Sequence, residues 1–289
     1  MATATRVGFI GLGVMGTPMA LNLARRFPLT VWNRSPGKYP LLKQAGASIA
    51  QTPAQVLQAS DIVFTMLFNA PAITSIMSHD FKLALAGKTL VNTSSIPVEC
   101  SESLAREVHE AGGDYIEMPV SGSKVPAEQG QLVGMLAGDP GVAERVKEYV
   151  EPLTCAAVYC GPIGSGLKSK YAVNTLLVTL TVGLSESMNL ARAQGLDLAA
   201  FAKVVDAGPM ASAYSRMKVD KILNNDWEPQ AGLRDCFNST QLIKSAVASA
   251  GTQSPLMEVC GRLYREALEA GLGEEDLIAV SKVIGKPNA

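Results

Sequence analysis

A glycine-rich segment close to the N-terminus limits the fold of this chain more than any other part of its sequence. Gly11, Gly13 and Gly16 are spaced G-x-G-x-x-G, between an apolar run at residues 7–10 and an apolar-periodic segment at residues 15–24. The run predicts a buried strand and the periodic segment a helix. In this context the first glycine allows a tight turn, the second lets a pyrophosphate approach the backbone, and the third lets the helix pack on the strand. The segment therefore predicts a dinucleotide site at a helix N-terminus, where free N–H groups favour phosphate.

The residues after the second predicted strand indicate which dinucleotide is bound. This strand, at residues 29–32, ends in Asn33, Arg34 and Ser35. Sites for NAD usually have Asp or Glu here, which accepts a hydrogen bond from the ribose 2′-hydroxyl, and this chain has neither. The Arg34 guanidinium suits a 2′-phosphate, and the Ser35 hydroxyl can donate as well. The alternative is a solvated arginine in a polar turn, but the position after the glycine motif favours NADP.

Composition narrows the class of protein. The length of 289 residues predicts two domains, or one with a large extension. The chain is 47% hydrophobic and 18% charged, with a formal net charge of −1, which predicts a globular protein and argues against a nucleic-acid partner. Two histidines leave little material for a metal site, so no metal is expected. Five cysteines without a C-x-x-C pair favour a reducing compartment, with Cys155 and Cys160 buried. The polar N-terminus and the short apolar run at residues 171–184 predict no signal peptide and no membrane span, hence a cytoplasmic protein.

Two patterns divide the chain near Gly164. Up to that point strands and helices alternate, which predicts an α/β domain with a doubly wound parallel sheet over residues 1–163. Residues 164–289 show helical periods alone, beginning with a long helix at residues 167–194 that is apolar around much of its circumference. We expect this helix to be buried on most sides and to pack against a partner subunit. The strands are expected at residues 7–10, 29–32, 47–49, 61–67, 88–92, 115–118, 131–137 and 156–159, and the helices between them at residues 15–24, 38–44, 53–59, 71–77, 97–111 and 140–150.

Two polar segments follow predicted strands of the first domain. Residues 92–95, Asn-Thr-Ser-Ser, lie at the carboxyl end of a strand, where ligands of open α/β sheets collect. Capping of the next helix explains them equally well. Residues 119–124 are rich in small residues that expose N–H groups and hydroxyls, which suits a substrate carboxylate. The alternative for this second segment is an ordinary tight turn.

Lys170 and Asn174 are the strongest candidates for catalysis. They are four residues apart, so they share one face of the predicted long helix, within apolar sequence. A lysine in such a place is desolvated unless it has a partner, which usually marks a role. An ammonium beside a carbonyl can polarise it, stabilise oxyanion charge and deliver a proton. The alternative is a lysine whose stem lies on apolar surface while its ammonium reaches water. Lys168 lies on a different face and is expected to be solvated.

Taken together, these motifs resemble the β-hydroxyacid dehydrogenase family, and most closely its glyoxylate and succinic semialdehyde reductases. The resemblance rests on the glycine motif, residues 33–35, residues 119–126 with 130–132, and residues 164–174. It implies a Rossmann-type domain, an all-α C-terminal domain and a long interdomain helix used in dimerisation. The implied activity is NADPH-dependent reduction of the carbonyl of a small semialdehyde or oxo acid, by a homodimer or homotetramer.

The resemblance also implies a set of site residues. Lys170 would be the catalytic acid, and Ser95 would lie beside cofactor and substrate. The implied substrate-binding residues are Ser121, Gly122, Ser123, Asn174 and Ala231. The cofactor-binding residues, in part from the motifs above, are Gly11, Leu12, Gly13, Val14, Met15, Gly16, Asn33, Arg34, Ser35, Met66, Leu67, Ser95 and Asn238.

The C-terminal half departs from the family pattern. Where relatives carry a Lys-Asp pair, this chain has Asn238 and Ser239, and a pocket aromatic becomes Ala231. The changes enlarge the site and remove a carboxylate that would keep Lys170 charged. They leave open a reductase of a bulkier or uncharged carbonyl or imine, and a non-catalytic cofactor-binding scaffold. Asp235 lies four residues before Ser239, so it either replaces the missing carboxylate and pairs with Lys170, or it pairs with a surface cation or caps the helix start.

Overall fold

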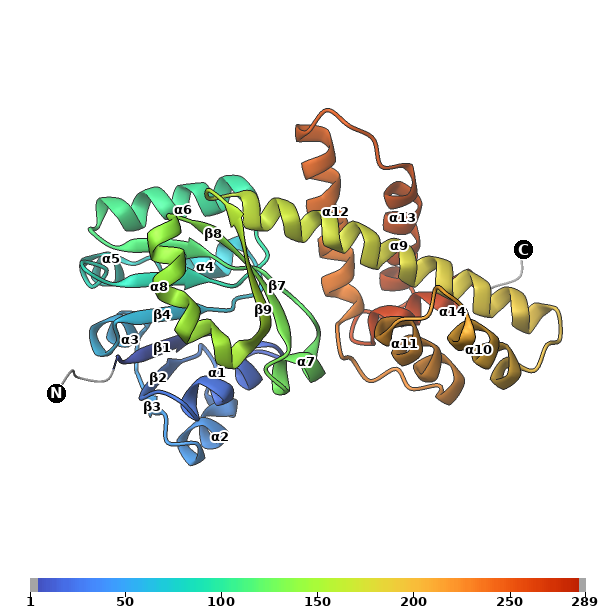
Figure 1. The fold of residues 1–289 in the computed structure, drawn as a ribbon, viewed down its shortest axis with the longest axis horizontal. Coiled ribbons are helices and arrows are strands. Elements are labelled where there is room, and N and C mark those ends of the chain that lie inside the picture. Colours follow the sequence, from blue (N-terminus) through green and yellow to red (C-terminus); the bar gives the residue numbers. More distant parts are fainter. Residues whose placement is uncertain (1–4, 286–289) are drawn as a thin grey trace. The chain divides into compact units, whose positions relative to one another are not determined.

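The computed structural model describes residues 5–285, which fall into two compact units that meet in sequence at Lys170 and Tyr171 (Figure 1). This division lies inside a long helix, and the domain boundary expected at residues 163 and 164 stays a prediction. Within the described residues, no helix has the length and apolar content that a bilayer crossing requires.

The N-terminal unit is built on a mixed sheet of nine strands. Its first six are parallel, in the order β3-β2-β1-β4-β5-β6, which confirms the doubly wound arrangement. The strands are β1 (Val7–Ile10), β2 (Leu29–Trp32), β3 (Ser48–Ile49), β4 (Ile62–Thr65), β5 (Thr89–Asn92), β6 (Asp114–Glu117), β7 (Val120–Ser121), β8 (Leu132–Gly138) and β9 (Thr154–Gly161).

The parallel arrangement expected for the sheet does not extend to its far end. Strand β8 runs antiparallel to both β6 and β7, and β9 is parallel to β8. The physical reason is the short connection between β6 and β8, which forms β7 and a single short helix in place of a full crossover helix, so the chain returns antiparallel. In the described sheet β9 pairs with β8 alone and is therefore an edge strand. Cys155 on this strand is exposed and Cys160 is half-buried, so the expected burial of these two thiols is wrong.

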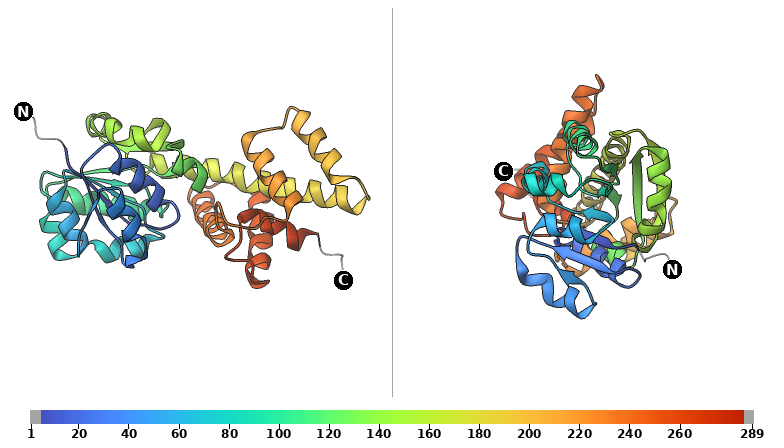
Figure 2. Two further views of the ribbon diagram at one scale, coloured as in Figure 1. Left: turned by 90° about the horizontal axis from the view of Figure 1, so that it is seen from below. Right: turned by 90° about the vertical axis from the view of Figure 1, so that its left-hand side faces the viewer.

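Helices cover both faces of this sheet (Figure 2). Helices α1 and α8 pack on one face, where the side chains of Val7 and Phe9 join their core, and α3 packs on the other, against the Gly8 side of β1. The bounds are α1 (Gly16–Ala24), α2 (Tyr39–Gln44, after the 3₁₀ turn η1, Pro36–Lys38), α3 (Pro53–Ala59), α4 (Ala70–Ile76), α5 (His79–Leu83), α6 (Val98–Glu110), α7 (Lys124–Glu128) and α8 (Pro140–Val150, followed by η2, Glu151–Leu153). The predicted strands and helices of this unit are all present. Helices α5 and α7 and strand β7 were not predicted, because each is too short to show a hydrophobic period.

The C-terminal unit is helical throughout its described part, which confirms the all-α expectation, and its one β-bridge joins Gly232 to Asp276. Its helices are α9 (Ser165–Ala193, which starts in the N-terminal unit), α10 (Leu198–Ala207), α11 (Ala213–Asn224), α12 (Leu233–Ser249), α13 (Pro255–Glu269), η3 (Leu277–Val280) and α14 (Ser281–Ile284).

Within this chain helix α9 is buried along one face, and its expected burial on most sides, which includes packing against a partner subunit, stays a prediction. The residues of this face recur every three or four positions, as in Asn174, Val178 and Thr181. On the opposite side Leu176, Leu180 and Leu190 are 62%, 50% and 60% exposed. The apolar circumference seen in the sequence is therefore filled by this chain on one side and left at the surface on the other.

A fully buried ion pair ties the C-terminal unit together. The Lys218 ammonium lies 2.7 Å from Asp276 Oδ1, and the two side chains are 2% and 0% exposed. The backbone N–H groups of Gln230 and Ile278 also donate to the Asp276 carboxylate, at 3.0 and 3.1 Å. Burial lowers the pKa of Lys218, and the charge of Asp276 opposes this shift. The pair thus joins α11, the segment before α12 and η3.

We expect Asp276→Ala to lower the free energy of unfolding by about 3–5 kcal/mol, because it leaves a buried ammonium and three backbone N–H groups without this acceptor. Glu274→Ala is the matched control, because its partner Arg234 and its own side chain are 54% and 89% exposed. That substitution is expected to cost at most about 1 kcal/mol. Urea denaturation measures the free energy of unfolding of both variants. Equal losses would show that the buried ion pair contributes no more to stability than the exposed one.

Candidate active site

The turn between β1 and α1 has room for nothing larger than glycine at two of its three glycine positions. Gly11 has φ +100°, and a Cβ there would overlap the carbonyl oxygen of Met66. A Cβ on Gly16 would overlap the carbonyl oxygen of Gly11. These two glycines therefore allow α1 to begin directly against the end of β1, as the spacing predicts.

Gly13 is different, because the protein's own packing does not require it. A Cβ added there would meet no atom within 4 Å. The neighbouring Val14 is 60% exposed, and Met15 caps α1 without a side-chain hydrogen bond. The backbone is thus open at the N-terminus of α1, where N–H groups and the helix dipole attract phosphate. This opening fits a dinucleotide pyrophosphate, because a side chain at Gly13 would occupy the space that the phosphates need.

Asn33 connects the end of β2 to the glycine turn. Its Oδ1 accepts from the Leu12 N–H at 2.9 Å, and its Nδ2 donates to the Ser35 carbonyl at 2.8 Å. The Tyr39 hydroxyl in turn accepts from the Asn33 N–H and donates to the Asn33 carbonyl, at 2.9 and 2.7 Å. Arg34 and Ser35 are exposed next to this anchored residue. Tyr39 was not among the predicted site residues, since nothing in its sequence spacing indicates the contact.

The residues after β4 and β5 complete this edge of the sheet. The Met66 N–H donates to the Ile10 carbonyl at 2.9 Å, which places the loop after β4 beside the glycine turn. The Leu67 N–H donates to Ser94 Oγ at 2.8 Å, and Ser95 is half-buried one residue later. The structure therefore brings the predicted cofactor residues of the N-terminal unit to the carboxyl ends of adjacent strands, where open α/β sheets bind ligands.

The small residues after β6 form a tight turn. Ser121 ends β7, Gly122 has φ +129°, and Ser123 caps α7. A Cβ on Gly122 would lie 2.6 Å from Leu132 Cδ2, so the turn itself requires glycine. This geometry accounts for the segment without a ligand, and its role toward a substrate carboxylate stays a prediction.

Lys170 and Asn174 lie one turn apart on α9, as predicted. Lys170 is half-buried, and Asn174 is 8% exposed. Asn174 Nδ2 donates to Ser239 Oγ on α12 at 3.4 Å. The Ser239 hydroxyl on α12 therefore accepts this hydrogen bond, at the position where the resemblance implied an aspartate.

The other predicted residues of the C-terminal unit lie around the start of α12. The Ala231 carbonyl accepts from Leu277 N–H at 2.9 Å, and Asn238 is exposed on α12. Asp235 lies in the first turn of α12, where partial burial and the charge of Glu274 raise its pKa and Arg234 opposes the shift. Asp235 is thus an acidic residue of the first turn of α12, and its side chain makes no cap hydrogen bond there. The roles of these residues toward cofactor or substrate stay predictions.

A buried polar network behind this edge was missed by sequence reasoning. It joins Asn92 of β5, Tyr115 and Glu117 of β6 and Ser101 of α6, all at most 1% exposed, to the N–H of Leu167 at the start of α9. The available signal was a carboxylate in the otherwise apolar run of residues 115–118. A buried carboxylate needs hydrogen-bond donors, so a partner was to be expected.

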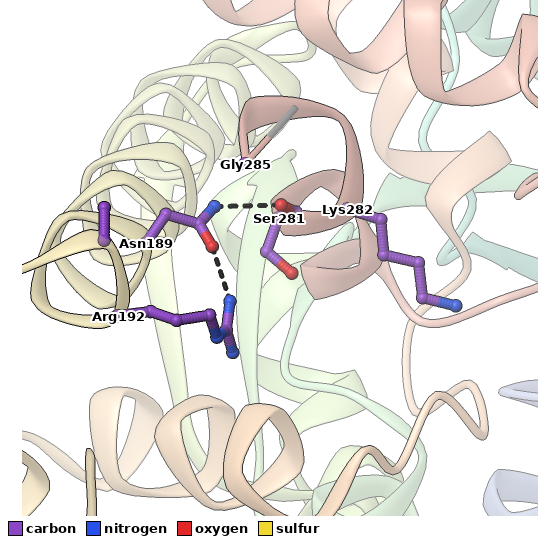
Figure 3. A pocket seen from close by; sticks show the side chains of 6 residues that line it. Asn189, Arg192, Ser281, Lys282 and Gly285 are labelled. Carbon is purple, nitrogen blue, oxygen red and sulfur yellow. Dashed lines mark hydrogen bonds between the residues drawn. The ribbon is translucent and has the colours of Figure 1, made fainter. Parts of the chain in front are cut away.

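A small pocket of about 250 Å³ in the C-terminal unit lies outside the predicted site (Figure 3). Its polar groups bond one another, because Asn189 Nδ2 donates to the Ser281 carbonyl and Arg192 donates to Asn189 Oδ1, at 2.9 and 2.7 Å. Lys282 on its rim pairs with Glu275. The pocket therefore offers little unused bonding capacity. Over residues 5–285, His, Cys, Asp and Glu side chains do not assemble into a group of three or more that could hold a metal ion.

Comparison with known proteins accounts for both units. The family model for the NAD binding domain of 6-phosphogluconate dehydrogenase matches residues 6–161, and that for the NAD-binding region of NADP-dependent 3-hydroxyisobutyrate dehydrogenase matches residues 164–284. The chain is 34% identical to 2-hydroxy-3-oxopropionate reductase of Escherichia coli (strain K12), over 96% of this chain and 97% of the relative. It is 29% identical to glyoxylate/succinic semialdehyde reductase 1 of Arabidopsis thaliana, over 96% and 98%.

A solved structure extends this likeness to the fold. Psf3 in complex with NADP⁺ and 2-OPP matches with a TM-score of 0.89 at 25% identity, over 96% of this chain and 99% of that one. The relatives act on CH–OH and C=O groups as NAD(P)-dependent hydroxyacid dehydrogenases and reductases. With the open glycine turn and the lysine of α9 in place, the chain belongs to the β-hydroxyacid dehydrogenase family and is an NAD(P)-dependent oxidoreductase.

Proposed function

We propose that this enzyme is an NADPH-dependent reductase of a small semialdehyde or oxo acid, with Lys170 as its general acid. The observation that carries the proposal is the open backbone at Gly13, together with a half-buried Lys170 on α9, whose first turn is hydrogen-bonded to Glu117 at the end of β6. The names of two relatives, 2-hydroxy-3-oxopropionate reductase and glyoxylate/succinic semialdehyde reductase, support the substrate class. The exposed Arg34 beside the anchored Asn33 supports NADP over NAD.

The chemistry divides between cofactor and protein. A bound NADPH supplies the hydride that reaches the carbonyl carbon. The Lys170 ammonium donates a hydrogen bond to the carbonyl oxygen, stabilises the charge that develops there and gives it a proton. Asn174 lies one turn further along α9 and orients the same substrate through its amide, which Ser239 holds at 3.4 Å. Backbone N–H groups and hydroxyls of residues 121–123 bind the substrate carboxylate.

A second candidate substrate class is a bulkier or uncharged carbonyl or an imine. The observations that favour it are Ala231 in place of a pocket aromatic, and Ser239 in place of a carboxylate beside Asn174. NADPH oxidation against a panel of semialdehydes, oxo acids, ketones and cyclic imines separates the two. Turnover confined to the acids supports the first class, and turnover confined to uncharged compounds supports the second.

We also propose that the enzyme is a cytoplasmic homodimer or a tetramer of such dimers. Leu176, Leu180 and Leu190 give α9 an exposed apolar stripe that a second copy of the chain would cover. The five cysteines, all free, suit a reducing compartment.

Arg34→Ala is expected to weaken NADPH binding by several-fold to a few hundred-fold, because a charge-assisted hydrogen bond worth about 1.5–3 kcal/mol is lost. NADH binding should change little. Arg34→Lys keeps the charge but loses the planar fork, so an intermediate loss is expected. Fluorescence titration with both cofactors measures the effect, and an equal loss with NADH would exclude recognition of the 2′-phosphate by Arg34.

Lys170→Ala should lower kcat by about a hundred- to ten-thousand-fold, the usual contribution of a positioned general acid. NADPH affinity should stay near the wild-type value, since the lysine acts on the carbonyl. Lys168→Ala is the control, because Lys168 is exposed on another side of the same helix. The measurement is single-turnover reduction under conditions where chemistry limits the rate. Retention of more than half the rate in Lys170→Ala would exclude the assignment.

The double substitution Leu176→Glu, Leu180→Glu should convert the protein to a monomer and leave its helical content unchanged, because both side chains are at least half exposed within the chain. Light scattering after size exclusion gives the mass, and circular dichroism gives the helicity. Leu41→Glu, at an exposed apolar residue of α2, is the control that should keep the wild-type mass. A wild-type protein that is already monomeric would refute the dimer.

A further inference from the structure

We propose that Glu117 is a positioning residue for the reaction, because it fixes the first turn of α9, and so Lys170, to the edge of the sheet that carries the cofactor residues. The inference rests on the proposed function, in which Lys170 is the acid. Glu117 is the last residue of β6 and is fully buried. Its Oε1 accepts from the Leu167 N–H at 3.1 Å, and Lys170 follows Leu167 by three residues, within one helical turn.

A chain of hydrogen bonds connects this anchor to the loop after β4. The Leu67 N–H donates to Ser94 Oγ at 2.8 Å, and the Ser94 N–H donates to Asn92 Oδ1 at 3.1 Å. Asn92 Nδ2 lies 3.2 Å from the Tyr115 hydroxyl, which lies 2.9 Å from Ser101 Oγ. The Ser101 hydroxyl donates to Glu117 Oε2 at 2.7 Å. The predicted cofactor loop and the start of α9 are therefore joined by an unbroken series of polar contacts.

The protons in this chain can be arranged in one way alone. At one end the Ser94 N–H is a fixed donor, so Asn92 presents Oδ1 to it and Nδ2 to Tyr115. Tyr115 must then donate to Ser101, which donates to Glu117. At the other end the Leu167 N–H is a second fixed donor. The hydrogen bonds of the chain therefore all run toward the Glu117 carboxylate, which accepts on both of its oxygens and donates no hydrogen.

Glutamine at position 117 has the same shape but brings two hydrogens on one terminal atom. Its oxygen can accept from Leu167, and its amide group then donates to Ser101. The Ser101 hydroxyl must then donate to the Tyr115 hydroxyl, and the Tyr115 hydroxyl must donate toward Asn92. Its neighbour there is Nδ2, which is itself a donor. If the Asn92 amide flipped, Oδ1 would accept from Tyr115, but Nδ2 would then face the Ser94 N–H, which is also a donor. Glu117→Gln therefore leaves one donor of this chain without an acceptor, in addition to the second amide hydrogen, although it removes no heavy atom from the packing.

A second substitution at the far end of the chain restores the balance. In Asn92→Asp with Glu117→Gln, the aspartate accepts from Ser94 and from Tyr115. Tyr115 accepts from Ser101, and Ser101 accepts from the glutamine amide, whose oxygen accepts from Leu167. Each donor on the path from the glutamine amide to Ser94 again has an acceptor, with the order reversed along the chain, and the second amide hydrogen is common to the single and the double variant. The double variant is thus a rescue that a role of Glu117 in packing alone does not predict.

The experiment measures single-turnover carbonyl reduction, NADPH binding and the hydrogen exchange of peptides that cover residues 165–171. We expect Glu117→Gln to lower the rate per NADPH-binding site by tenfold or more, to change NADPH affinity by less than threefold and to speed exchange at the start of α9. Asn92→Asp with Glu117→Gln should return the rate to within about threefold of Asn92→Asp alone. Glu110→Gln, at an exposed glutamate of α6, is the matched control and should behave as wild type.

A double-mutant cycle with Lys170→Ala shows whether Glu117 acts through the lysine. In the Lys170→Ala background, Glu117→Gln should cost less than twofold in rate, because the group that it positions is gone. A wild-type rate in Glu117→Gln, an additive loss in the cycle, or no rescue by Asn92→Asp would each overturn the proposal. If the enzyme reduces none of the carbonyls tested, the proposed function fails, whereas the exchange of residues 165–171 still decides whether Glu117 holds the first turn of α9.

Discussion

The turn from β1 to α1 leaves no space for a side chain at either Gly11 or Gly16, and the arrangement of the N-terminal unit follows from that restriction. With Cβ atoms absent at these two positions, α1 starts directly against the strand ends. Its N-terminus then lies where the carboxyl ends of adjacent parallel strands meet. Asn33, Met66 and Leu67 reach the same edge because their strands are neighbours of β1 in the sheet. The open backbone at Gly13 is therefore a consequence of packing around the other two glycines.

A second restriction acts at the start of α9. A buried carboxylate is costly unless donors surround it, and Glu117 receives one donor from α6 and one from the first turn of α9. The same contact that satisfies Glu117 thereby fixes the helix that carries Lys170. In the C-terminal unit Asp276 plays a comparable part, since it gathers the Lys218 ammonium and backbone N–H groups from separate segments. In both units a single buried carboxylate joins elements that are distant in sequence.

The parts of the fold that were predictable are those with a local signal. The glycine spacing predicted the turn at Gly11 and Gly16, and the apolar periodicity of residues 15–24 predicted the helix that follows it. The antiparallel return of β8 was not predictable, because the period of a strand is the same in either direction. The division of α9 into a side covered by this chain and an exposed side was not predictable for a related reason, because an apolar residue in the sequence does not tell which chain covers it.

The polar network from Asn92 to Glu117 could not be predicted from the sequence for another reason. Its members come from β5, α6 and β6, and their contact depends on the strand register that pairs Asn92 with Glu117. Tyr39 is similar, since its contact with the Asn33 backbone arises from a turn and leaves no spacing pattern. Residues that carry a family motif were therefore found, whereas residues that hold those motifs in place were not.

In the proposed reaction one edge of the N-terminal unit binds the dinucleotide, and Lys170 protonates the substrate oxygen there. A crystal structure with NADP⁺ and a small hydroxy acid would test both parts at once. We expect the pyrophosphate on the backbone at Gly13–Met15, the 2′-phosphate on Arg34, and the hydroxyl oxygen about 2.6–3.2 Å from Lys170 Nζ. A substrate hydroxyl bound to another residue, with the Lys170 ammonium directed away from it, would exclude Lys170 as the acid.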